Sequence, residues 1–418
     1  MKSFEEELGK IYIDLNLRSE VDIDDAISKL EDSNLKLKEK KLINLGYLYL
    51  AQDNASIAEK QFTKAVEIIE SPYTLSHFGF YQYLTGNYIK AKEALLKAIE
   101  LDSNDIELRA ELVTVLLELG ELDTADKINL KNIKYEPLNP KYYSERAQIA
   151  TASLNFESAI YYSSFAILLD PNNSLRYSNR GVLSFSIGAY SESLVDLSKA
   201  INLNPDYPNY YLYRASANNA LGNFNNASND LETSLNLGLD NINKGYLEAK
   251  FNNFYLSGEI EKAFELYKDN IDEYSNNSNI LYQVSTTLFQ QENYQEALET
   301  IYKAISIESH IFSYTLLLFK ILSKIKDNFD DAILLIENYK ENYPMNFINF
   351  IEIIEILIKS KEINYAKKII LEALESYPES PKLYNLLCSV YHETGDKNKY
   401  EKNYKIYEEI SRITKLLN

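Results

Sequence analysis

The sequence is poor in the residues from which metal and redox centres are usually built. It has no tryptophan, a single cysteine, Cys388, and three histidines that lie far apart in the chain, at positions 77, 310 and 392. One cysteine excludes an intramolecular disulfide and suits a reducing compartment. No histidine, cysteine or carboxylate group has the spacing of a metal site, and the few glycines form no phosphate-binding loop. We therefore expect no metal and no other cofactor.

Positive charge is also scarce. The 418 residues include 43 lysines and arginines against 62 acidic residues, for a net charge of −19. Nucleic acids and anionic membrane surfaces are themselves negative, so neither is an expected partner. The most apolar segment, residues 311–325, is too short to cross a bilayer and carries two lysines. The N-terminus shows no signal peptide, and we expect a cytoplasmic protein, although an exported chain that has lost its leader stays open.

What the sequence does have is a 34-residue repeat. Arg180, Gly188 and Asp196 recur 34 positions later as Arg214, Gly222 and Asp230. When Arg180 is taken as position 7 of its unit, position 20 is small in ten units: Ala58, Ala91, Ala125, Ala159, Ser193, Ala227, Ala263, Ala297, Ala332 and Ala366. Position 32 is a helix-ending proline in five units: Pro137, Pro171, Pro205, Pro344 and Pro378.

Within each unit, apolar residues follow the period of two helices, as Tyr177, Val182 and Phe185 do in one half of their unit. Helices this short are unstable alone and must stack on neighbours. With its small residues at positions 8 and 20 and its proline at position 32, the chain resembles the tetratricopeptide repeat family. The resemblance implies an all-α fold, a right-handed superhelical α-solenoid of stacked antiparallel helix hairpins.

The resemblance extends over nearly the whole chain, with small insertions near residues 242 and 312. The predicted units are 39–71, 72–105, 106–139, 140–173, 174–207, 208–241, 244–277, 278–311, 313–346, 347–380 and 381–414. We divide the chain into a degenerate N-terminal repeat or cap at 1–38, a regular array at 39–241, a less regular array at 242–380, and a last repeat with a capping helix at 381–418.

The recurring arginines allow two interpretations. They could form a row of guanidinium groups that binds carboxylates or phosphates. Alternatively, Arg180 pairs with Asp196 and Arg214 with Asp230, because positions 7 and 23 fall on facing helices of one hairpin. We favour the structural pairs. Arg146 has Tyr162 in place of the aspartate, and it is the better candidate for a free or differently paired arginine.

In the tetratricopeptide family, ligands usually lie in a concave groove lined by the first helix of each unit. In units 140–241 the corresponding positions are mostly neutral and polar, unlike the basic cluster with which one subclass binds a peptide's C-terminal carboxylate. Four of these residues are candidates for hydrogen bonds to an extended peptide: Lys141, Gln148, Asn209 and Asn219. The alternative is an ordinary hydrated groove.

In units 313–380 the same groove positions are apolar. They are Tyr314, Leu317, Ile321, Ile325, Ile348, Ile351 and Ile358. An uncovered apolar patch of this kind marks a partner site, for an amphipathic helix or for a second copy of this chain. The alternative, which the residues leave open, is that the chain covers these positions itself.

The sequence therefore predicts a non-enzymatic scaffold or adaptor that binds a peptide or a partner protein along its groove, as part of a multiprotein assembly. A second hypothesis is a regulatory sensor whose solenoid is compacted by a small ligand or a signalling peptide. An enzyme is the least favoured class, because the chain has almost no sequence outside the repeats and no cluster of catalytic side chains.

Overall fold

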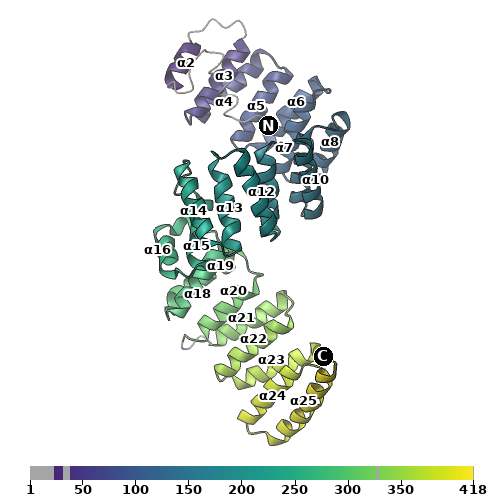
Figure 1. The fold of residues 1–418 in the computed structure, drawn as a ribbon, viewed down its shortest axis with the longest axis vertical. Coiled ribbons are helices and arrows are strands. Elements are labelled where there is room, and N and C mark those ends of the chain that lie inside the picture. Colours follow the sequence, from purple (N-terminus) through teal and green to yellow (C-terminus); the bar gives the residue numbers. More distant parts are fainter. Residues whose placement is uncertain (1–22, 32–37, 326–328, 418) are drawn as a thin grey trace. The chain divides into compact units, whose positions relative to one another are not determined.

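The structure, a computed structural model, describes residues 23–31, 38–325 and 329–417. Within these ranges the chain forms α-helices and no β-strand, which confirms the all-α prediction. Consecutive helices lie beside one another as hairpins (Figure 1). They belong to two compact units, Met1–Asn241 and Ile242–Asn418. The finer division into four segments stays a prediction, and most of the predicted N-terminal cap lies outside the described residues.

Among the described residues of the first unit, α2 is followed by six hairpins whose helices are of similar length. The bounds are α2 Ile23–Glu31, α3 Lys38–Ala51, α4 Ala55–Ile68, α5 Pro72–Leu84, α6 Tyr88–Leu101, α7 Ile106–Glu118, α8 Leu122–Tyr135, α9 Pro140–Ala152, α10 Phe156–Leu169, α11 Ser174–Ser186, α12 Tyr190–Leu203, α13 Pro208–Ala220 and α14 Phe224–Asn236. The first helices of these hairpins begin at the starts of the predicted units, or one residue before.

The part of the second unit that the structure describes has five hairpins, and one of them ends in a short extra helix, α17. The bounds are α15 Lys244–Leu256, α16 Ile260–Asp269, α17 Ile271–Tyr274, α18 Ser278–Gln290, α19 Tyr294–Ile307, α20 Phe312–Leu322, α21 Phe329–Asn342, α22 Phe347–Lys359, α23 Ile363–Ser376, α24 Pro381–Glu393 and α25 Lys397–Leu417. The predicted repeat of helix hairpins is thus confirmed in both units.

Small side chains lie where the two helices of a hairpin cross. All ten residues at position 20 are at most 1% exposed. On the facing helix, a Cβ atom added to Gly46 would lie 2.6 Å from the ring of Phe62, and one added to Gly181 would lie 2.9 Å from Leu197 Cγ. These helices approach so closely that a larger side chain would have to displace its neighbour.

In every hairpin whose turn the structure describes completely, that turn contains a residue in the left-handed region. In the hairpin α11–α12, Gly188 has φ +79°, and the Ala189 amide closes the turn by donating to the Ser184 carbonyl at 2.8 Å. In the hairpin α9–α10, Leu154 takes the same place at φ +57°. The turn therefore forms even where the repeat lacks glycine, at the cost of backbone strain.

The structure corrects the predicted register of one unit. The Tyr314 hydroxyl donates to Ser278 Oγ at 3.3 Å, just as Ser174 and Tyr210, also 36 residues apart, are joined at 3.0 Å. Because α20 begins at Phe312, this unit starts one residue earlier than predicted. The extra residue lies between α20 and α21, whose starts are 17 residues apart rather than the 16 found in α9–α10.

Candidate functional site

The guanidinium of Arg180 is fully engaged within the chain. Its Nε and Nη2 atoms donate to the two carboxylate oxygens of Asp196, each at 2.7 Å, and Nη1 donates to Ser164 Oγ at 2.9 Å. Asp196 is only 8% exposed. These hydrogen bonds from the side chain to Asp196 raise the pKa of Arg180 above its ordinary value, despite the opposing effect of burial.

Arg214 repeats this arrangement one unit later. It donates to the carboxylate of Asp230 at 2.9 and 2.6 Å, and Asn218 Nδ2 donates to the same carboxylate at 3.1 Å. Each arginine joins the two helices of its own hairpin and reaches a serine of the preceding one, Ser164 or Ser198. Neither therefore offers an unoccupied guanidinium fork to a ligand.

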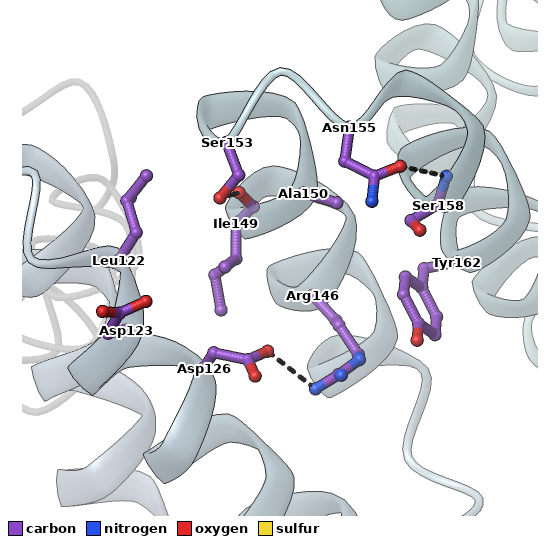
Figure 2. Close-up of a pocket in the computed structure, with 10 residues that line it drawn as sticks. All are labelled: Leu122, Asp123, Asp126, Arg146, Ile149, Ala150, Ser153, Asn155, Ser158 and Tyr162. Carbon is purple, nitrogen blue, oxygen red and sulfur yellow. Dashed lines mark hydrogen bonds and ion pairs between the residues drawn. The ribbon is translucent and has the colours of Figure 1, made fainter.

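Arg146 is paired differently. Tyr162 stands where the other two hairpins have aspartate, and the guanidinium packs on its ring, 4.9 Å from the centroid. Nη1 lies 2.9 Å from Asp126 Oδ1 in the preceding hairpin, an ion pair that lacks hydrogen-bond geometry. Figure 2 shows the side chain between these two groups, at the edge of a 240 Å³ pocket formed by α8, α9 and α10.

A larger groove lies along the first helices of the hairpins in the first unit. Its volume is about 690 Å³. It is lined by residues of α5, α7, α9, α10, α11 and α13, which are Tyr83, Thr114, Leu117, Glu118, Ser144, Ala147, Gln148, Thr151, Ala152, Ser163, Arg176, Asn179, Val182, Leu183, Ser186 and Tyr213. The lining is mostly small, neutral and polar or apolar.

Of the four predicted peptide-binding residues, Gln148 alone lines this groove. Lys141 forms an ion pair with Glu107 at 2.5 Å, and Asn209 donates to the hydroxyl of Tyr207 at 3.3 Å. Asn219 is buried inside the unit, so the prediction that it reaches a ligand is wrong. Its position in the repeat lines the groove in other units, but here the α13 side chain is packed inward.

Sequence reasoning missed several residues that do line the groove. Asn179 and Tyr213 both occupy position 6 of their units, which the prediction did not assign to the groove. Arg176, at position 3, is held there by Asp170 at 3.1 Å and by Ser144 Oγ at 2.5 Å. The repeat period contains a usable signal, because position 6 contributes to the lining in two neighbouring units.

The predicted apolar groove of units 313–380 is wrong in its main element. Tyr314, Leu317, Ile321 and Ile351 are at most 6% exposed, since the chain itself covers them. Ile325 and Ile358 are half-buried, and Ile348 is exposed. The physical reason in α20 is that residues 314–319, 321 and 322 are all buried, as expected for a helix that is apolar on nearly every side and is packed on nearly every side.

In the part of the chain that the structure describes, no three histidine, cysteine or acidic side chains are grouped closely enough to hold a metal ion. No described helix is long and apolar enough to cross a membrane. Cys388 is buried, and this burial raises the pKa of its thiol.

Helix hairpins that recur along the chain and stack on one another place it in the class of helical-repeat proteins. The family model described as tetratricopeptide repeat matches residues 78–105 and 278–310, one segment in each compact unit. Together with the period of the hairpins, these matches identify a tetratricopeptide repeat protein, as the sequence predicts.

The human protein O-mannosyl-transferase TMTC1 is 28% identical to this chain over 130 residues. That segment is 31% of this chain and spans only 15% of the relative's length.

Similar solved structures include a tetratricopeptide repeat protein from Parabacteroides merdae, with 17% identity and a TM-score of 0.49 over 60% of this chain and 98% of that one. Yeast Tom70 has 14% identity and a TM-score of 0.41, over 99% and 96% of the two chains. The Cut9–Hcn1 hetero-tetramer of the APC/C has 12% identity and a TM-score of 0.49, over 93% and 84%. At this level of similarity the structures carry no functional information.

Proposed function

We propose that this protein is a non-enzymatic scaffold that binds an extended segment of a partner protein in the 690 Å³ groove of the first unit. The observation that carries the proposal is the groove itself, which is lined by side chains from five successive first helices. A site that extends across five successive first helices suits an extended polypeptide. A cytoplasmic location and membership of a multiprotein assembly remain predictions.

The lining offers two kinds of contact. Gln148, Thr151 and Asn179 supply amide and hydroxyl groups that can exchange hydrogen bonds with a peptide backbone. Val182 and Tyr213 are partly exposed apolar side chains in the same groove. Rigid aromatic and aliphatic groups of this kind are typical anchors in protein interfaces.

The charged residues of the groove indicate which class of partner segment it can bind. Glu118 and Arg176 are its charged lining residues, and Arg176 is already bound to Asp170 and Ser144. No cluster of free cations lines the groove, so the affinity should not depend on a peptide's terminal carboxylate. We expect a partner segment of neutral, mixed polar and apolar character.

The test uses the full chain and one pair of matched variants. A partner is first captured from the native cells by cross-linking and identified by mass spectrometry. Val182→Glu places a charge in the groove and should weaken that binding at least roughly ten-fold, about 1.4 kcal/mol. Val195→Glu adds the same charge on the exposed surface of α12, outside the groove. Equal effects of the two substitutions, measured by calorimetry, would exclude the groove as the binding site.

A further inference from the structure

We propose that Arg146 binds a carboxylate supplied from outside this chain. In the two following hairpins the arginine at position 7 receives an aspartate carboxylate from its own hairpin. In the hairpin α9–α10 that aspartate is replaced by Tyr162. The 240 Å³ pocket beside Arg146 shares no lining residue with the groove, so the proposal does not depend on the proposed function.

Arg146 lacks hydrogen bonds that Arg180 makes. Arg180 uses Nε and Nη2 for Asp196 and Nη1 for Ser164. In Arg146, Nη1 faces Asp126, while Nε and Nη2 have no hydrogen-bond partner among the described residues. The serine is missing too, because Leu130 occupies its place in the preceding unit. The two-pronged edge that grips a carboxylate in both neighbours is therefore unused here.

Neighbouring side chains restrict the orientation of the Arg146 guanidinium before any ligand binds. Its side chain is only 17% exposed, and stacking on the ring of Tyr162 restricts its plane. The same pocket is lined by Ser158 and by Asn155, whose side-chain oxygen accepts the Ser158 amide at 3.1 Å and whose NH₂ group has no partner among the described residues. Figure 2 shows both residues at the rim of the pocket that contains Arg146 and Tyr162.

The local charge sets the expected strength. Asp126 already balances Arg146, and the exposed Asp123 adds a negative charge to the pocket wall. A second carboxylate on the same guanidinium is therefore repelled by these groups, and its binding should be weak and sensitive to salt. Two sources share this chemistry: the acidic side chain of a partner protein, and a small free carboxylate.

The test follows the Nε–Hε signal of Arg146 by NMR in the full chain labelled in its seven arginines. The signal is assigned by its loss in Arg146→Lys. The probes are sodium acetate and the blocked peptide acetyl-Ala-Asp-Ala-amide, with sodium chloride and the asparagine peptide as references. We expect a saturable shift with a carboxylate probe and none with its reference. Saturation by acetate indicates a small-molecule source, and saturation by the peptide alone indicates a partner side chain.

Tyr162→Asp supplies the missing carboxylate within the hairpin and should weaken probe binding at least roughly ten-fold, as expected when an external group must displace a charge-assisted hydrogen bond. Tyr161→Asp adds the same charge on the exposed side of α10 and should leave binding nearly unchanged. If Tyr162→Asp fails to fold, Arg146→Lys becomes the deciding variant, because lysine keeps the charge and loses the two-pronged edge. Its binding of acetate is then measured by saturation transfer from the protein. Absence of saturation with both probes, or undiminished binding in the deciding variant, would overturn the proposal.

Discussion

Two hairpins, one from each compact unit, solve the same packing problem with different chemistry. In the first unit, positions 7 and 23 of the hairpin α11–α12 hold Arg180 and Asp196, joined by two hydrogen bonds. In the second unit, the equivalent positions of α22–α23 hold Ile353 and Ile369, both fully buried. One repeat geometry thus accepts either an ion pair or two aliphatic side chains between the same pair of helices.

Position 8, where the two helices of a hairpin cross, also holds different residues in different hairpins. Hairpins with glycine or alanine there, such as α11–α12 with Gly181, have the most extensive contact between their two helices. Contact is much less extensive in α15–α16, with Phe251, and in α22–α23, with Ile354. A bulky side chain at the crossing keeps two helices apart. The 34-residue period therefore specifies where each hairpin forms, while a few residues at the crossing determine how closely its two helices approach.

The largest effect should come from placing a lone charge in the apolar version. Ile369→Asp buries a carboxylate that has no arginine opposite it, and we expect a loss of about 4 kcal/mol or more in the free energy of unfolding. Urea denaturation followed by circular dichroism measures this loss. Adding Ile353→Arg should recover part of it. Leu371→Asp, on the exposed side of the same helix, is the control and should change little; an equal loss there would refute the assignment.

The converse change tests the charged version. Arg180→Ala leaves the buried carboxylate of Asp196 without its partner and should cost about 3 kcal/mol. Arg146→Ala should cost under about 1 kcal/mol, because Asp126 is 38% exposed and can be hydrated instead. The double variant Arg180→Ile with Asp196→Ile reproduces the apolar pair of α22–α23. Its free energy of unfolding should lie within about 1 kcal/mol of that of the native chain. An Arg180→Ala chain that melts normally but loses partner binding would reverse the structural assignment.

An effect smaller than the loss of Arg180 concerns pH, and two glutamates respond in opposite directions. Burial between α8 and α9 raises the pKa of Glu145 from 4.5 to about 7, since the opposing effects of Lys141 and of a hydrogen bond from Asn129 are weaker. Burial also acts on Glu337 in the second unit. There, hydrogen bonds from Lys368, Tyr365 and Lys340 outweigh it and lower the pKa to about 2.

A raised carboxyl pKa destabilises the fold as pH rises from 4.5 through 7, because the unfolded chain releases this proton in that range while the folded chain still keeps it. Glu145→Gln should remove that decline and stabilise the chain at pH 8 by about 2 kcal/mol. Glu337 contributes stability above its unfolded pKa and loses it as pH falls toward 2, by under about 1 kcal/mol since it is partly solvated. The urea concentration at the midpoint of unfolding, measured from pH 3 to 8, distinguishes the contributions of Glu145 and Glu337. A Glu145→Gln chain with an unaltered pH profile would contradict the assignment.

Much of the fold follows from local signals. The alanines at position 20 mark the helix crossing, and all are buried there. The prolines at position 32 mark the ends of second helices, as in α10, which ends at Leu169 two residues before Pro171. These features could be predicted because helix formation, termination and crossing depend on residues within a few turns of one another.

The candidate site was less predictable, because a groove is defined by which face each helix turns toward its neighbours. Tyr314 and Leu317 occupy predicted groove positions, yet both are buried because α20 is packed on nearly every side. Asn219 was predicted to face a ligand and is packed inside its unit. Position within the repeat gives the average direction of a side chain, and the packing of each helix decides whether that side chain is exposed.

The sequence by itself determined the repeat, the hairpins and the Arg–Asp spacing, since a 34-residue period specifies all of these from nearby residues. Only the tertiary structure decided which side chains the hairpins cover and which they leave open. The partner of Arg146 is the clearest case: with Tyr162 in place of aspartate, the guanidinium reaches Asp126 of the preceding hairpin. Such a contact depends on how successive hairpins stack, and no single unit contains that information.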